Sequence, residues 1–253
     1  MKRIHILIGI VFVITTSILM SDSGKTEFGK ITLPLGRVSV QSQGDDGWKR
    51  AMPKKTVYVG DKIRTLAKSR CEISLRGGGK LRIGENSELE LTSADVKPMK
   101  KEFNANLTKG NIWVSAKAAF GEKKNVSVRT PTAVAAIRGT TYRATADSSE
   151  SSVLVYSGAV DVNSAKKIIE ERKEKRKSLF DTGTPFKLGP VEKIEAPTEV
   201  AGPFEVSLED WIKLAKGWCI TVRSDGKYHL YEFDKDEDAK DAFVRWNTKL
   251  DLE

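Results

Sequence analysis

Side chains that could perform acid–base, nucleophilic or metal chemistry are sparse in this 253-residue chain. It has two histidines, and because His5 lies in the apolar N-terminal segment, His229 is alone in the remainder. A single histidine cannot build a histidine-rich metal site. The Gly-x-Ser-x-Gly motif that exposes a nucleophilic serine in hydrolases is absent as well. The inventory therefore predicts a protein that is not an enzyme and that holds no metal or cofactor.

Two segments are similar to ligand-binding loops but lack the residues on which binding depends. Arg76–Lys80 is glycine-rich like a phosphate loop, yet Leu81 occupies the position where a serine or threonine would hold magnesium. Asp234–Asp238 is like the start of a calcium loop, but Arg245 stands where the bidentate glutamate belongs. We expect the first to be a turn between strands, and the acids of the second to stabilise a helix N-terminus.

The clearest pattern is structural, because glycines that precede strand-like segments recur at intervals of about 24 residues. They are Gly36, Gly60, Gly84, Gly110, Gly139 and Gly158. After three of them the residues alternate, which places one set of side chains in a common core: Val38, Val40, Ile112, Val114, Val160 and Val162. The glycines are expected to supply positive φ in the turn that starts each strand. Stacked units of this kind predict an all-β roll of short strands, or a sandwich.

Several ordered segments carry a resemblance to a known family. The most specific is Val126–Ala144, VSVRTPTAVAAIRGTTYRA, followed by VLVYSGAVDV at Val153–Val162. Upstream, LGRVSVQS at Leu35–Ser42 and GDKIRT at Gly60–Thr65 stand in the matching order. Together they resemble the FecR domain, a periplasmic module first known from bacterial signal-transducing regulators. The resemblance covers residues 30–163, which we expect to form an all-β domain.

The FecR resemblance implies a protein that binds and relays rather than one that catalyses. The turns at its RTP and RGT segments are expected to be structural, at Pro131 and at Arg138, Gly139 and Thr140. Regulators of this family combine a cytoplasmic anti-sigma segment, one membrane span and the periplasmic domain. Only about five residues precede the apolar N-terminal run here, so sigma-factor regulation is not carried over to this chain.

Residues 1–23 are typical of an export signal. Lys2 and Arg3 precede a mostly apolar run, Ile6–Met20, which suits a signal peptide better than a stable span of about 20 apolar residues. An uncleaved signal anchor is the alternative, and it would provide the only membrane contact. Export places the chain in the periplasm or cell envelope. The net charge of +9 favours an anionic partner or simply disperses the protein, and we expect no nucleic-acid binding.

The chain has two cysteines, Cys71 and Cys219, in different segments. Export permits a disulfide between them. Cys71 alternates with Ile73 and Leu75, however, so its side chain is expected to face the core and to act as a small apolar group. Two buried free thiols are therefore the favoured interpretation, and a bridge is the alternative.

Composition changes after the predicted β domain. Residues 164–205 indicate a short charged helix followed by a proline-rich linker. Residues 206–253 predict a small α+β module of helix, hairpin and helix: Ser207–Lys216, a hairpin turning at Asp225-Gly226, and a helix to Leu250. The second helix should present one apolar face, formed by Ala239, Phe243, Trp246 and Leu250. So small a module is expected to lean on the β domain or on a partner, and its removal is expected to leave the β domain folded.

The leading hypothesis is a non-enzymatic extracytoplasmic protein that binds or scaffolds in the bacterial cell envelope. Its partner would be another envelope protein or a cell-wall or surface glycan, contacted through aromatic anchors chosen from Trp211, Trp218, Tyr228 and Tyr231. At most two of these are expected to be exposed, since the core competes for them. A membrane-tethered sensory subunit in envelope signal transduction is the alternative. An envelope hydrolase is a remote one, because no nucleophile, base and orienting group can be named.

Overall fold

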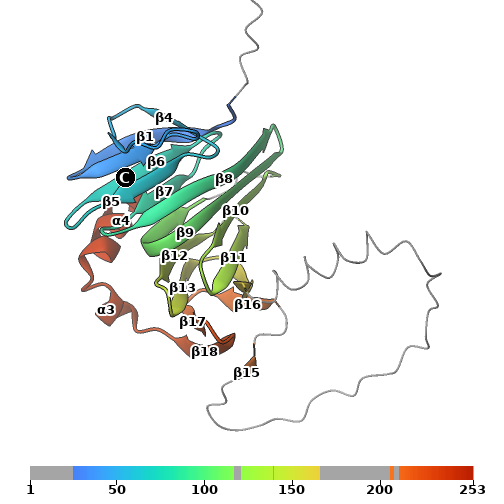
Figure 1. The fold of residues 1–253 in the computed structure, drawn as a ribbon. Coiled ribbons are helices and arrows are strands. Elements are labelled where there is room, and N and C mark those ends of the chain that lie inside the picture. Colours follow the sequence, from blue (N-terminus) through green and yellow to red (C-terminus); the bar gives the residue numbers. More distant parts are fainter. Residues whose placement is uncertain (1–24, 117–120, 139, 166–205, 208–210, 253) are drawn as a thin grey trace, which may run out of the picture.

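The computed structural model describes residues 25–116, 121–138, 140–165, 206–207 and 211–252. These residues form two large β-sheets that pack face to face, with helices near the C-terminus (Figure 1). Three predicted features lie outside the described residues: the export segment 1–23, Gly139, and most of the charged helix and linker 164–205.

Sheet A contains strands from both ends of the chain. In spatial order it consists of β4 (Thr56–Tyr58), β1 (Glu27–Leu35), β6 (Arg70–Leu75), β7 (Lys80–Ile83), the second part of β9 (Lys100–Ser115), β12 (Thr141–Ala146), β13 (Glu150–Ser157), β17 (Trp218–Arg223), β18 (Lys227–Glu232) and β15 (Val206–Ser207). All of these pairings are antiparallel. The sheet is therefore built largely from hairpins, which need only short connections.

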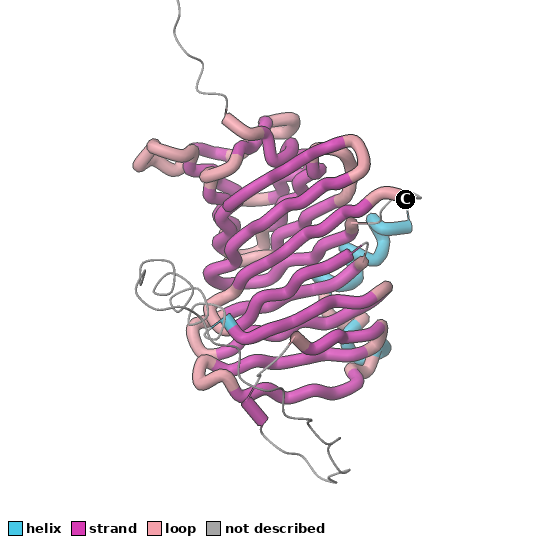
Figure 2. The backbone as a smooth tube through the Cα atoms, turned by 90° about the vertical axis from the view of Figure 1, so that its right-hand side faces the viewer, coloured by secondary structure: helices cyan, strands magenta, loops and turns pink. Residues whose placement is uncertain are grey.

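Sheet B has the same construction. In spatial order it consists of β3 (Lys49–Arg50), β2 (Val38–Gln41), β5 (Lys62–Thr65), β8 (Glu88–Lys97), the first part of β9, β10 (Lys123–Arg129), β11 (Ala133–Arg138), β14 (Ala159–Ser164) and β16 (Ile212–Ala215). Among the described strands of this sheet, the β9–β10 pairing alone is parallel. Figure 2 shows the strands stacked like rungs along one long axis.

The core lies between the two sheets. The six residues predicted to share one buried face are at most 1% exposed, which confirms the alternation: Val38, Val40, Ile112, Val114, Val160 and Val162. Phe28 of sheet A meets Phe103 of sheet B edge to face, with ring centroids 5.2 Å apart. Cys71 and Cys219 are both buried and free, as the favoured interpretation predicted. Burial raises the pKa of the Cys71 thiol to about 12.

The chain passes from one sheet to the other at the glycines of the 24-residue repeat. Gly36 separates β1 in sheet A from β2 in sheet B. In the same way, Gly60 separates β4 in sheet A from β5 in sheet B, and Gly84 separates β7 in sheet A from β8 in sheet B. Gly110 divides β9 between the two sheets, and Gly158 separates β13 in sheet A from β14 in sheet B. The period therefore marks crossings between layers. A chain that winds between two stacked sheets combines the predicted roll with the predicted sandwich.

Close packing explains why glycine stands at two of these crossings. Gly36 has a φ of 78° and Gly158 one of 80°, a region that favours glycine. A β-carbon would lie 2.6 Å from Ser69 Oγ at the first position and 2.5 Å from Thr140 Cγ2 at the second. Both hydroxyl groups also bind the backbone just after the glycine. Ser69 Oγ accepts a hydrogen bond from the next amide (2.9 Å), and Thr140 Oγ1 donates one to the next carbonyl (3.1 Å).

Two glycines depart from the predicted role in a turn. Gly110 has a φ of 100° but lies inside the continuous strand β9, where the next amide donates to Ser87 Oγ at 2.9 Å. Gly84 has no positive φ, so that part of the prediction is wrong. Its backbone approaches β9 so closely that a β-carbon would lie 2.9 Å from Asn111 Cβ. The requirement at Gly84 is therefore space rather than a left-handed backbone conformation.

The C-terminal module is built into the sandwich. Strand β17 pairs with β13 in sheet A, β16 pairs with β14 in sheet B, and Leu214, Ile220 and Val222 join the main core. The expectation that the module leans on the β domain is confirmed. The arrangement argues against the expectation that the β domain stays folded without it, since removal would uncover part of the core and two strand edges.

The helices of the module were predicted only in part. The hairpin is present as β17 and β18, but the predicted helix Ser207–Lys216 is wrong, because the described part forms β15 and β16. Residues Ile212–Ala215 alternate between the core and solvent, and pairing with β14 outweighs the local helix signals. The second helix is divided into α3 (Lys235–Asp238) and α4 (Ala242–Leu252). Its predicted apolar face is right at Phe243, which is buried, and wrong at Ala239, which is exposed.

Helices α3 and α4, the C-terminal strap, are fixed to the outer face of sheet A by charged side chains. Arg82 is only 2% exposed and makes ion pairs with Glu72 (2.7 Å) and Asp251 of the strap (2.5 Å). The other carboxylate oxygen of Asp251 accepts a hydrogen bond from Trp113 Nε1 at 2.9 Å. A buried guanidinium with two carboxylates is costly to leave partly unpaired, so this contact holds the end of the chain on sheet A.

Further contacts define the chemistry of the strap. Arg143 Nη2 lies 2.5 Å from Asp238, which also accepts a hydrogen bond from Tyr156 Oη at 2.5 Å. Burial raises the pKa of Tyr156, so this phenol remains a donor. Burial also raises the pKa of Glu72, but hydrogen bonds from Thr32, Arg82 and Lys80 outweigh that effect and hold its pKa below the usual value.

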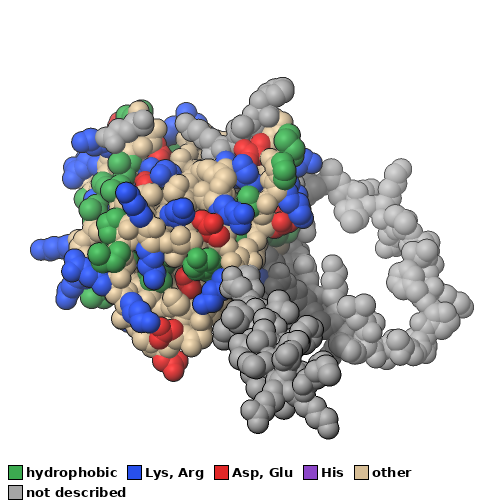
Figure 3. Space-filling view, turned by 90° about the horizontal axis from the view of Figure 1, so that it is seen from above, with side chains coloured by type: hydrophobic (Ala, Val, Ile, Leu, Met, Phe, Trp, Pro, Cys, Tyr) green, Lys and Arg blue, Asp and Glu red, His purple; other side chains and the backbone are tan. Residues whose placement is uncertain are grey.

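The basic surplus does not gather in one patch on the end of the sandwich near β1 and β4. Figure 3 looks down onto that end and shows lysine and arginine side chains spread over it, with aspartate and glutamate among them. Among the described residues, no helix has the length and apolar character needed to cross a membrane.

Candidate binding site on the outer face of sheet B

The register of sheet B aligns polar side chains across its outer face. Paired positions on β8, β9, β10, β11, β14 and β16 form one row: Ser93, Asn104, Ser127, Ala136, Asp161 and Lys213. Their sequence neighbours, such as Phe103, Val126 and Val160, point into the core and are buried. The alternation that builds the core therefore also sets out this row on the opposite face.

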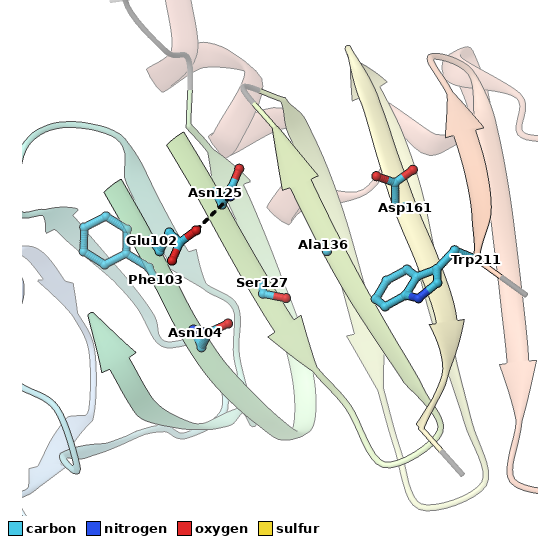
Figure 4. Close-up of a pocket in the computed structure, with 8 residues that line it drawn as sticks. All are labelled: Glu102, Phe103, Asn104, Asn125, Ser127, Ala136, Asp161 and Trp211. Carbon is cyan, nitrogen blue, oxygen red and sulfur yellow. Dashed lines mark hydrogen bonds between the residues drawn. The ribbon is translucent and has the colours of Figure 1, made fainter. Parts of the chain in front are cut away.

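A trough of about 550 Å³ lies along the row. It is lined by Glu102, Asn104, Asn125, Ser127, Ala136, Asp161 and Trp211, together with Phe103, whose ring is buried in the core (Figure 4). Ala136 is the smallest of these side chains and occupies the middle of the row, which leaves space above the sheet. Trp211 and Asp161 lie toward one end and Glu102 lies toward the other. Trp211 is 49% exposed.

Hydrogen bonds within the trough hold its polar side chains in place. Asn125 Nδ2 donates to Glu102 Oε1 at 3.3 Å, and Lys100 Nζ lies 2.9 Å from the same carboxylate oxygen. Asn104 Nδ2 donates to Ser93 Oγ at 2.6 Å. Each of the two asparagine side chains has a second N–H group that can donate and an amide oxygen that can accept, so both can still form hydrogen bonds to a ligand. The trough therefore offers oriented donors and acceptors next to one exposed aromatic ring.

The carboxylates and the hydroxyl group that line the trough are not brought together. The two carboxylates, Glu102 and Asp161, lie on β9 and β14, with β10 and β11 between them. The one hydroxyl group, Ser127 Oγ, donates to the carbonyl of Ala135 (3.3 Å) rather than to a base. In the part of the chain that the structure describes, no group of three His, Cys, Asp or Glu side chains is placed to hold a metal ion. The arrangement can form hydrogen bonds and stack, which are functions of recognition.

The four aromatic residues predicted as anchors do not form one site. Trp211 lines the trough, whereas Tyr228 and Tyr231 line a separate depression of about 410 Å³ on the outer side of β17 and β18, with His229. Tyr231 is 40% exposed and Tyr228 is half-buried. Trp218 is half-buried and packs against the main core. Two of the four are thus exposed, which is the upper limit that was expected.

The predicted turn residues lie around the trough rather than in it. Pro131 is exposed in the turn between β10 and β11, and Arg138 is the last residue of β11. Thr140 is fully buried against Gly158, at the crossing that leads into β14 and Asp161. These positions shape the strands that carry the polar row.

Sequence reasoning missed the asparagines and serines of the row. Asn104, Asn125 and Ser127 each stand between two inward-facing apolar residues or beside one, and this alternation shows that they point outward. Alternation alone does not show that they are neighbours, because that depends on the pairing of β9 with β10. The available signal was a series of short amide and hydroxyl side chains at outward positions of successive strands.

Together, the fold and the trough define an all-β protein of two stacked sheets with an open polar recess on one face. Residues 61–161 match the family model described as FecR protein. The resemblance to the FecR domain is therefore confirmed over residues 61–161, which fall within the residues 30–163 that showed it. Strands β9, β10 and β11 lie within the matched segment, and Asp161 of β14 is its last residue, whereas Trp211 is contributed from outside it.

Comparison with solved structures gives a distant likeness. Two crystal structures described as a "putative anti-sigma factor" from Parabacteroides distasonis ATCC 8503 each share 13% sequence identity with this chain, with a TM-score of 0.45. The matched region covers 70% of this chain and 62% of theirs, so the chain spans less than two thirds of their length. No curated protein matches the chain.

Proposed function

We propose that the chain is a non-enzymatic binding protein of the bacterial cell envelope, and that the trough on the outer face of sheet B is its recognition surface. The observation that carries the proposal is the trough itself, in which half-exposed Trp211 stands beside oriented amide and carboxylate groups. A FecR domain fits this location and role, since the family is associated with the envelope. Ligand binding at the trough would also be the input of an envelope signalling function.

The sheet that carries the trough favours binding because it is rigid. Its floor is a hydrogen-bonded ladder of five strands, from β8 to β14, and most of the lining side chains are short: Asn104, Asn125, Ser127, Ala136 and Asp161. Short side chains that are already hydrogen-bonded lose little conformational freedom when a ligand arrives. A site on strands is also held more accurately than a site on loops. The trough therefore has the order that a recognition surface requires before its ligand binds.

Filling the trough tests this function. Ala136→Phe places an aromatic ring at the centre of the row, on the outer face of a strand, where an aromatic residue is compatible with the fold. Ala239→Phe makes the same change at an exposed position of the C-terminal strap, beyond sheet A. Binding of the purified variants to isolated bacterial envelopes is then measured by co-sedimentation. We expect Ala136→Phe to lose at least tenfold in affinity and Ala239→Phe to bind like the unsubstituted chain. Equal binding of all three would refute the assignment of the recognition surface.

A further inference from the structure

We propose that the ligand of the trough is a neutral glycan, an extended chain of sugar rings without acidic groups. This inference rests on the proposed function and names the ligand class of the same site. It follows from the kinds of polar groups in and beside the trough, the position of Trp211, the length of the polar row and the balance of charges along it.

Polar groups in the trough and beside it occur as adjacent donor and acceptor pairs. The amide of Asn125 lies beside the carboxylate of Glu102, and the amide of Asn104 lies beside the hydroxyl of Ser93. A sugar hydroxyl both donates and accepts a hydrogen bond, and neighbouring hydroxyls of one ring present such groups side by side. An amide next to a carboxylate or hydroxyl supplies the complementary set. Asp161 adds a further acceptor at the other end of the row.

The indole of Trp211 supplies the apolar contact that a sugar ring needs. One face of a pyranose ring carries mainly C–H groups, which pack against an aromatic ring while the hydroxyls at the edge remain hydrogen-bonded. Trp211 lies at the end of the trough near Asp161, and its ring stands over the side of the sheet next to Ala136 (Figure 4). The methyl group of Ala136 leaves room for a ring between the indole and the neighbouring polar side chains. Tryptophan is suited to this role because it has a large apolar surface and a polar N–H.

The length of the row favours a chain of sugars over a single one. Neighbouring strands lie about 4.8 Å apart, so the four steps from Ser93 on β8 to Asp161 on β14 span about 19 Å. This distance exceeds the size of a monosaccharide several times. A glycan lying across the strands would meet a polar side chain at nearly every step, with the gap at Ala136 beside Trp211.

Other ligand classes fit the trough less well. A peptide that adds a strand needs the unpaired backbone groups of a sheet edge, whereas the trough lies on a face where the ladder is complete. Nucleic acid is held mainly through its phosphates by lysine and arginine. The charged side chains that line the trough are Glu102 and Asp161, and each has a lysine beside it: Lys100 pairs with Glu102, and Lys213 is the strand partner of Asp161. The site therefore lacks the excess of lysine and arginine that holds phosphates or acidic polysaccharides, and this balance of charge favours a neutral glycan.

Titration with defined oligosaccharides tests the inference on the full chain. Isothermal titration calorimetry is carried out with N-acetylglucosamine and glucose oligomers of two to six units, and with galacturonate hexamer as the acidic comparison. We expect one neutral series to bind with an affinity that rises with length, and the acidic hexamer to bind at least tenfold more weakly. Trp211→Ala and Ala136→Phe should each reduce the affinity at least tenfold, and Ala239→Phe should leave it unchanged. Absence of binding in both neutral series, or binding that Ala136→Phe does not weaken, would overturn the glycan assignment.

The envelope assay separates this inference from the proposed function. If protease treatment of the envelopes abolishes binding that Ala136→Phe also abolishes, the trough recognises a protein, and the glycan inference alone fails. If the treated envelopes still bind the chain and Ala136→Phe still blocks that binding, the glycan inference gains support. Binding that is insensitive to Ala136→Phe contradicts both.

Discussion

Glycine-to-alanine substitutions at two positions can distinguish two reasons why glycine is needed where the chain passes between the sheets. One reason is the positive φ of the backbone, and the other is close packing around the α-carbon. Gly158 and Gly44 both have a φ of 80°. At Gly158 a β-carbon would lie 2.5 Å from Thr140 Cγ2, whereas nothing lies within 4 Å of a β-carbon at Gly44. Gly44→Ala therefore carries only the cost of a left-handed alanine, about 1 kcal/mol. Gly158→Ala adds overpacking of about 1–3 kcal/mol, for a total loss of about 2–4 kcal/mol in the free energy of unfolding.

Urea unfolding followed by circular dichroism measures both losses. Because Gly158 is the crossing into β14, the same substitution should also shift Asp161 and weaken binding at the trough. Gly44, in a loop of exposed or half-buried residues, should leave binding unchanged. Equal losses of stability in the two variants would show that close contact with Thr140 is not what requires glycine at this crossing.

Three further predictions concern the strap, acid stability and the thiols. Asp251→Ala should lower the free energy of unfolding by about 2–4 kcal/mol because it leaves a buried arginine without one partner. Asp236→Ala, on the exposed surface of α3, should change the free energy of unfolding by less than about 1 kcal/mol. Similar losses in the two variants would show that the ion pair of Asp251 does not stabilise the fold. The folded-state pKa of Glu72 is depressed, so its stabilising effect is complete above the usual glutamate pKa of about 4.3 and is lost as the pH falls below it. The urea midpoint of the unsubstituted chain should therefore fall more between pH 6 and pH 3 than that of Glu72→Gln, and parallel declines would contradict this. Burial raises the pKa of both Cys71 and Cys219, so a disulfide reagent should label them only in urea, and rapid labelling of the native protein would speak against their burial.

The layered core could be predicted from the sequence because its signals are local. A glycine followed by alternating residues determines both where a strand starts and which of its side chains face inward, and this succeeded at Val38, Ile112 and Val160. That the same glycines mark crossings between sheets could not be predicted, since the sheet to which a strand belongs depends on its distant partners. Gly110 shows this most clearly, because the strand continues through it while the sheet changes.

The candidate site was less predictable for the same reason. Asn104, Ser127 and Asp161 become neighbours only through the registers of three strand pairings. Their outward orientation follows from the sequence, but their alignment in one row does not. At β16 a local signal was misleading. The capping residues from Ser207 onward indicated a helix, but pairing with β14 makes Ile212–Ala215 a strand. That strand brings Trp211 to the edge of the trough.

Hydroxyl-radical footprinting can show whether recognition takes place on the outer face of sheet B. Trp211 in the trough and Tyr231 in the β18 depression are oxidisable and similarly exposed, at 49% and 40%. Oxidation of each is measured by mass spectrometry with and without envelope fragments that bind the chain. Binding should protect Trp211 from oxidation and leave the oxidation of Tyr231 unchanged. Protection of Tyr231 with unchanged oxidation of Trp211 would contradict it and move recognition to β18.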